Sequence, residues 1–233
     1  MLNKLKSDLK KLSVNKKVEV FSRFFKTGKG EYGQGDKFLG ISVPLQRQLA
    51  KQYLGLDFDD LQNLLNSDIH EYRLVALLIL VQKYSKGDDK LKSKVFKFYL
   101  KNTKRVNNRD LVDLSSYHIV GNHLLESDKS ILYKLAKSNN LREKRISIVS
   151  TYTFIKNHQF QDTFQIAEIL LNDTHDLIHK AVGWMLREAG NRDQIAEEKF
   201  LKIHYKNMPR TMLRYAIEKF EESKRQKYLK GLI

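Results

Sequence analysis

Four segments of the chain resemble one another and recur with a period of about 36 residues. They read EYRLVALLIL from Glu71, NNRDLVDLSS from Asn107, EKRISIVSTY from Glu143 and IHKAVGWMLR from Ile178. Each has the apolar spacing of a helix, and strand-like alternation is scarce. A repeat of this length built from helix pairs predicts an all-α fold, an α-solenoid of HEAT-like helical repeats whose second helices line a concave basic face.

The remaining apolar spacing predicts further helices throughout the chain. Leu2, Leu5, Leu9 and Leu12 mark a first helix, and a second runs from about Asn15 to Phe25. From Val43 onward, helices are expected near 43–54, 57–66, 69–85, 89–102, 108–125, 128–138, 142–157, 161–172, 175–189, 193–206 and 209–221. Because the connections leave no room for a linker, we expect a single domain over residues 1–233.

One glycine-rich segment, Thr27 to Gly40, holds five of the eleven glycines and is expected to be a loop. It lacks the preceding strand and the GK[ST] ending of a phosphate-binding loop. We expect it to be a mobile loop near the ligand face.

Charge is the strongest compositional signal, with 43 Lys and Arg against 27 Asp and Glu and a net charge of +16. Such a surface favours polyanions, above all nucleic acid, with an acidic membrane surface as the competing partner. The amino terminus lacks the apolar core of a signal peptide, and no apolar run could span a bilayer, so we expect a soluble, cytoplasmic protein. We also expect it to be a monomer. The chain has no cysteine, and its seven histidines form no ligand pattern, so neither a metal nor a cofactor is expected.

The stretch Asn107 to Gly121 (NNRDLVDLSSYHIVG) places a carboxylate within an apolar helical pattern. Arg109 and Asp113 are four residues apart and share one helix face. A helix face that carries both charges is expected to contact a polar partner. The alternative is an ordinary ion pair on a solvated helix flank.

Aligning the repeats puts Arg73, Arg109, Arg145 and Lys180 at one structural position. A ladder of four cations would suit contacts with the phosphates of duplex DNA. Alternatively, each cation pairs with a carboxylate of a neighbouring helix. Trp184 follows Lys180 by one helical turn, so we expect it to share that face and to be partly exposed.

The motifs NNRDLVDLSSYHIVG, LREKRISIVSTY, HDLIHKAVGWMLREAG and NMPRTMLRYAIEKF resemble the AlkD-type DNA alkylation repair family from about Phe38 to Phe220. The resemblance implies a HEAT-like solenoid that wraps DNA. It also implies that active members cleave N3- or N7-alkylated purines from DNA without inserting the lesion in a pocket.

By this resemblance, Asp113 matches the aspartate that stabilises positive charge on the deoxyribose as the glycosidic bond breaks. Arg145 matches an arginine that contacts phosphate, and Trp184 matches the second aromatic residue of the site. Arg109 stands where the active enzymes have a first tryptophan. An aromatic wall attracts a cationic alkylpurine by about 0.5 to 2 kcal/mol, whereas an arginine repels it.

These observations predict a DNA-binding member of the family whose base excision is weakened or lost. Two alternatives remain open. One is an active DNA glycosylase that uses Asp113 and Arg145, and the other is a non-enzymatic scaffold that binds RNA or an acidic protein.

Overall fold

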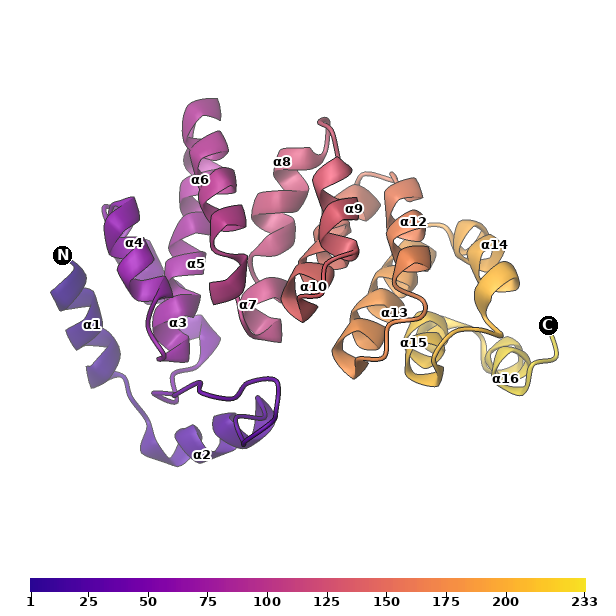
Figure 1. Ribbon diagram of the computed structural model, residues 1–233, viewed down its shortest axis with the longest axis horizontal. Coiled ribbons are helices and arrows are strands. Elements are labelled where there is room, and N and C mark those ends of the chain that lie inside the picture. Colours follow the sequence, from indigo (N-terminus) through magenta and orange to yellow (C-terminus); the bar gives the residue numbers. More distant parts are fainter. The chain divides into compact units, whose positions relative to one another are not determined.

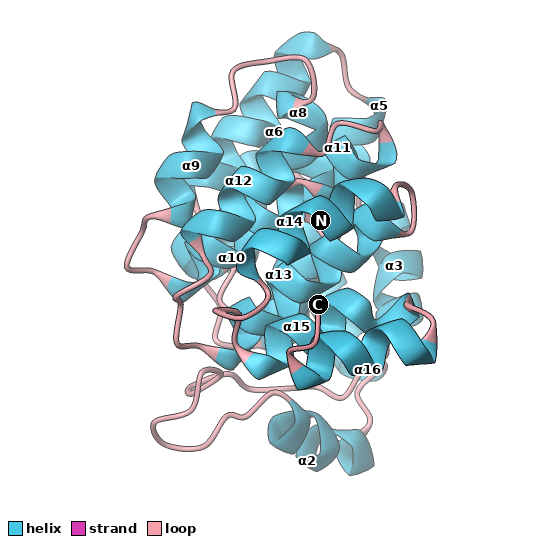
Figure 2. Cartoon of the chain, turned by 90° about the vertical axis from the view of Figure 1, so that its right-hand side faces the viewer, coloured by secondary structure: helices cyan, strands magenta, loops and turns pink.

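The computed structural model describes residues 1–233, and every regular element in it is a helix (Figure 2). A single β-bridge, between Lys37 and Ile69, lies outside the helices. The prediction of an all-α fold is confirmed. The chain divides into two compact units, Met1–Ile119 and Val120–Ile233. A bilayer span would need a longer and more apolar helix than any that this chain forms.

The first unit is built around helix α5, which α3, α4, α6 and α7 all contact (Figure 1). Residues 74 to 80 of α5 are buried on every side, as expected for a helix surrounded by others. The helices of this unit are α1 (Leu2–Lys11), α2 (Asn15–Phe24), α3 (Val43–Gln52), α4 (Phe58–Leu65), α5 (His70–Lys86), α6 (Asp89–Lys101), the 3₁₀ turn η1 (Thr103–Arg105) and α7 (Arg109–Asp113).

The second unit is built around α13, which contacts α10, α12, α14 and α15 (Figure 1). A Cβ atom on Gly183 would lie 2.4 Å from the carbonyl oxygen of Met212, so a glycine is needed where α15 crosses α13. A π-helix, η2 (Tyr117–Gly121), leads into this unit. Its helices are α8 (Asn122–Leu124), α9 (Ser130–Ala136), α10 (Leu141–Ser150), α11 (Tyr152–Lys156), α12 (Gln161–Ile169), α13 (Asp176–Gly190), α14 (Gln194–His204), α15 (Arg210–Ala216), the 3₁₀ turn η3 (Ile217–Lys219) and α16 (Glu222–Lys230).

The repeat found in the sequence corresponds to successive second helices. Its four segments fall on α5, α7, α10 and α13. Three of these helices pack against the first helix of their own pair: α5 packs against α4, α10 against α9 and α13 against α12. The chain is therefore made of the paired helical repeats of an α-solenoid.

Side chains that cap the backbone set where several helices begin. The carboxylates of Asp57, Asp88 and Asp193 accept hydrogen bonds of 2.8, 2.8 and 2.9 Å from amide groups in the first turns of α4, α6 and α14. These groups have no partner within the helix itself, so each cap stabilises the helix start.

The helix expected over 108–125 is interrupted. It divides into α7, η2 and α8 because the hydroxyl of Ser115 donates to the carbonyl of Leu111, one turn earlier, and competes with the backbone. Thr151 likewise donates to the carbonyl of Ile148 and divides the helix expected over 142–157. The sequence analysis missed α16, whose start is capped by the Glu221 carboxylate.

The glycine-rich segment is a loop, as predicted, and its end packs tightly on the amino-terminal helices. Gly40 has a φ of +78°, and a Cβ there would lie 2.4 Å from the carbonyl oxygen of Val14. This position therefore requires glycine on both conformational and steric grounds.

Glu197 is a buried acid in the second unit. It lies in the first turn of α14 with 1% of its surface exposed, and its Oε1 accepts no hydrogen bond. Burial raises the pKa of Glu197 to about 9, with a further contribution from the charge of Glu198, while Arg187 lowers it. The folded protein therefore holds a proton here that the unfolded chain releases above about pH 4.5.

We expect Glu197→Gln to stabilise the protein at alkaline pH. Because the folded state binds the extra proton, wild-type stability should fall as pH rises from about 4.5 to about 9. The amide removes this dependence, so the free energy of unfolding should gain on the order of 1 to 3 kcal/mol at pH 8 and little at pH 5. Urea unfolding of both proteins at pH 5 and pH 8 measures these free energies. The control is Glu168→Gln on the exposed face of α12. An unchanged pH dependence in Glu197→Gln would contradict the assignment.

Candidate nucleic-acid interface

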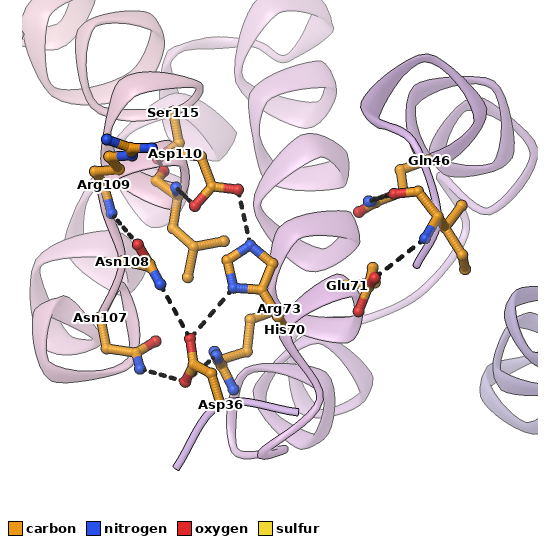
Figure 3. A network of polar contacts seen from close by, with 12 residues as sticks. Asp36, Gln46, His70, Glu71, Arg73, Asn107, Asn108, Arg109, Asp110 and Ser115 are labelled. Atoms are coloured by element: carbon orange, nitrogen blue, oxygen red, sulfur yellow. Dashed lines mark hydrogen bonds and ion pairs between the residues drawn. The ribbon is translucent and has the colours of Figure 1, made fainter. Parts of the chain in front are cut away.

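Asp36 lies at the centre of a buried group of polar side chains in the unit Met1–Ile119 (Figure 3). Its carboxylate forms an ion pair with Arg73 of α5, with an N···O distance of 2.7 Å. It also accepts hydrogen bonds from His70 Nδ1 at 3.3 Å, Asn107 Nδ2 at 2.8 Å and Asn108 Nδ2 at 3.3 Å. One carboxylate therefore joins the glycine-rich loop to α5 and to the start of α7.

His70 extends this group to α7, because its Nε2 lies 2.7 Å from the Asp110 carboxylate. Burial by itself lowers the pKa of His70, but the charge and hydrogen bond of Asp110 and the hydrogen bond of Asp36 outweigh it and raise the pKa to about 9. Burial raises the pKa of Asp36, yet the His70 hydrogen bond and the Arg73 charge bring it below its ordinary value. At neutral pH His70 is a cation that donates from both ring nitrogens, and Asp36 is an anion.

Glu71, the next residue of α5, holds the end of the loop. Its carboxylate accepts hydrogen bonds from the backbone amides of Leu39, Gly40 and Ile41 at 2.9, 2.8 and 3.2 Å. Glu71 has no exposed surface. Three amide hydrogen bonds compensate a buried carboxylate, so this contact fixes the chain just before α3.

Arg109 faces the carboxyl end of α2. The centre of its guanidinium lies 4.2 Å from the ring centroid of Phe24 and 5.7 Å from that of Phe25. An ion pair between Arg109 and Asp113 stays a prediction, whereas the contact of the guanidinium with the phenylalanine rings is observed. An arginine over an aromatic face gains about 0.5 to 2 kcal/mol, comparable to or better than an exposed pair on a helix.

Asp113 is the last residue of α7 and is half-buried. Its charge reaches Tyr99, which is fully buried and whose hydroxyl lies 2.9 Å from Ser115 Oγ. The pKa of Tyr99 is raised, mainly by burial and to a smaller extent by the Asp113 charge, while the Ser115 hydrogen bond lowers it. A π-helix begins four residues later, at Tyr117–Gly121, and π-helices often accompany functional sites.

The other predicted site residues lie in the unit Val120–Ile233. Arg145 of α10 is buried, and its Nη1 donates to the carbonyl of Leu177 at 2.5 Å. Lys180 of α13 forms an ion pair of 2.6 Å with Asp176, and 35% of its side chain is exposed. Trp184 is half-buried, with Nε1 donating to Glu188 at 3.3 Å. The expected partial exposure of Trp184 is confirmed.

The four aligned cations do not share one environment. Arg73 is 3% exposed and Arg145 is 6% exposed, whereas Arg109 and Lys180 are partly open to solvent. The four side chains therefore do not form an exposed ladder of cations, because Arg73 and Arg145 are buried. Arg73 is held by Asp36 and by the carbonyl of Ser67 at 2.6 Å, so it has a structural partner, although this partner lies in the glycine-rich loop and not in a neighbouring helix.

No group of three histidine or acidic side chains is arranged to hold a metal ion. The acidic residues that do cluster, Asp36 and Asp110, are engaged by His70 and Arg73. Together, His70 and Asp36 fix the backbone at the start of α7 through Asp110 and Asn108. Asp113 lies at the other end of the same helix.

The sequence analysis missed the roles of Asp36, His70 and Glu71. Two signals were present: an aspartate in a glycine-rich loop, and a His-Glu pair at the start of a helix whose residues 74 to 80 are all apolar. Polar residues beside such a helix are buried, so each needs a partner of opposite charge or hydrogen-bonding type.

The fold and these side chains define an all-helical repeat protein. The chain belongs to the DNA alkylation repair enzyme family, whose model matches residues 5–220. It is similar in structure to a predicted DNA alkylation repair enzyme from Enterococcus faecalis, with a TM-score of 0.65 and 15% identity, covering 89% of this chain and 96% of that one. This likeness shows a shared fold. No curated protein matches the sequence. The resemblance to the AlkD-type family is confirmed.

Proposed function

We propose that the protein is a HEAT-like repeat protein that binds double-stranded DNA through its phosphates, as a cytoplasmic monomer, and that its base excision is weakened or lost. The family match supports a role in DNA alkylation repair. Because that match spans both compact units, we treat residues 1–233 as one functional domain.

The net charge of +16 supports binding to a polyanion. Lys180 is the best candidate for a phosphate contact, because its side chain is partly exposed and its ion pair with Asp176 lies at the surface. An exposed ion pair of this kind contributes little stability, so Lys180 can exchange it for a phosphate. Trp184, one turn later on α13, offers a half-exposed aromatic ring beside it. Arg145 and Arg73 would act by fixing the helices, since their guanidinium groups are buried.

The observation that carries the loss of excision is the cation at position 109. An alkylated purine of the relevant class is itself a cation, so an aromatic wall attracts it and an arginine repels it. The contact of Arg109 with Phe24 holds the positive charge in place and covers part of that ring. Repulsion at this point raises the free energy of the cationic lesion bound beside α7.

The alternative of an active glycosylase is supported by Asp113. Its carboxylate is retained at the end of α7 and is half-buried. A carboxylate in such a place could stabilise the positive charge that develops on the deoxyribose when a glycosidic bond breaks. Base release from methylated DNA separates the two functions.

We expect duplex DNA to bind with a steep salt dependence and little sequence preference. Each phosphate that a side chain neutralises contributes about −0.9 to the slope of log K against log salt. Lys180→Ala should weaken binding and make the slope shallower by about one, measured by fluorescence anisotropy of labelled duplexes. The matched control is Lys92→Ala on α6, whose side chain is 36% exposed and is paired with Asp89.

Two results would count against DNA as the partner: no binding at low salt, or a salt slope that Lys180→Ala and Lys92→Ala change equally. Competition by RNA or by an acidic protein that exceeds competition by duplex DNA would favour the scaffold function instead.

We expect the wild type to release methylated purines hardly faster than they depart spontaneously. Arg109→Trp removes the repulsion and restores an aromatic contact, so release should rise about ten- to a hundredfold. Adding Asp113→Asn should abolish this gain, because an amide cannot neutralise the forming charge. The control is Arg225→Trp on α16, outside the family match. Rapid release by the wild type that Asp113→Asn removes would make the protein an active glycosylase.

A further inference from the structure

An apolar pocket of about 340 Å³ lies in the unit Met1–Ile119, between α2, the end of the glycine-rich loop, α3, α5 and α7. Its size is at the lower end of the range for small-molecule sites. The aromatic part of its lining comes from Phe21, Phe24, Phe25 and Phe38. Asp113 does not line it, so the pocket is separate from the carboxylate discussed above.

The aromatic walls are held in place by one another and by His70. The rings of Phe25 and Phe38 are stacked at 5.2 Å with an interplanar angle of 10°. Both also stack on the His70 imidazole, at 5.1 and 4.7 Å. Because His70 is fixed by Asp36 and Asp110, these faces are already arranged before any ligand binds. Phe21 and Phe24 meet these stacked rings edge-on, so the lining is a fixed aromatic wall, which favours a flat aromatic ligand.

One polar group of the lining has unused hydrogen-bonding capacity. Gln46 of α3 is 2% exposed, and its Nε2 donates to the carbonyl of Ile41 at 2.7 Å. Its Oε1 is buried and accepts no hydrogen bond. Figure 3 shows this side chain extending from its helix toward the one that carries Glu71. A buried acceptor without a donor is costly, so a ligand that supplies a donor here gains a hydrogen bond.

The other polar groups in the lining are already engaged. Glu71 accepts from three backbone amides, and the Asp110 carboxylate accepts from His70 and from the amide of Leu111. A second acceptor on the ligand would find no free donor among these side chains. The negative faces of the phenylalanine rings also disfavour an anion. Arg109 over Phe24 and the cationic His70 disfavour a cation, so the pocket selects a neutral planar molecule with at least one N–H group.

We propose that this pocket binds a planar nitrogen heteroaromatic of the nucleobase class, with its rings against the phenylalanine faces and a ring or amino N–H donating to Gln46 Oε1. The mouth lies beside Val20 and Phe24, whose side chains are 61% and 59% exposed. The assignment does not depend on base excision or on DNA binding, since it concerns the free small molecule.

Titration of the full chain with adenine, followed by isothermal calorimetry and saturation-transfer NMR without DNA, tests the site. The wild type should bind one adenine per chain. Val20→Trp should close the mouth and abolish binding, with an unchanged melting temperature because Val20 is exposed. Gln46→Leu should weaken binding about three- to tenfold through loss of one hydrogen bond. Gln52→Leu, at an exposed position of the same helix, is the matched control.

Three results would overturn the proposal. The first is no saturable binding by the wild type up to the solubility limit of adenine. The second is binding that Val20→Trp leaves intact, since adenine would then lie elsewhere. The third is loss with Val20→Trp but not with Gln46→Leu, which would leave an apolar cavity that does not recognise an N–H donor. Failure of DNA binding or of base release would leave these results unaffected.

Discussion

The ion pair between Asp36 and Arg73 is the contact on which the first unit depends, because it neutralises a charge that the glycine-rich loop carries into the interior. Removing one partner of a buried pair typically costs about 3 to 5 kcal/mol, since the other charge remains without compensation. His70 extends the pair to Asp110, and Glu71 fixes the backbone of Leu39 to Ile41. The loop, the walls of the aromatic pocket and the start of α7 therefore share one electrostatic anchor.

This anchor also explains the behaviour of α7. Asp110 is held by His70, so the helix is fixed one turn before Asp113. Arg109, on the adjoining face, then meets Phe24 of α2. The cation at position 109 thus connects α7 to α2.

The repeat period predicted α5, α7, α10 and α13 because each of these helices reproduces the same local apolar spacing. Spacing also placed Arg109 and Asp113 on one face. It could not show that Arg73 is buried, since burial depends on a loop that packs over the helix start from a distant part of the sequence. Spacing also could not show that Arg109 contacts Phe24, because this contact depends on how α2 packs beside α7.

Buried opposite charges hold the glycine-rich loop against α5 and α7, and the protonation of His70 reports this arrangement directly. An NMR titration of the histidine rings, with the His70 signal identified by its loss in His70→Asn, measures the pKa of His70. We expect His70 to stay cationic through neutral pH and to titrate near the value of about 9 that Asp110 and Asp36 impose. Titration at or below the ordinary value of 6.5 would contradict it, since the ring would then lack these anionic partners.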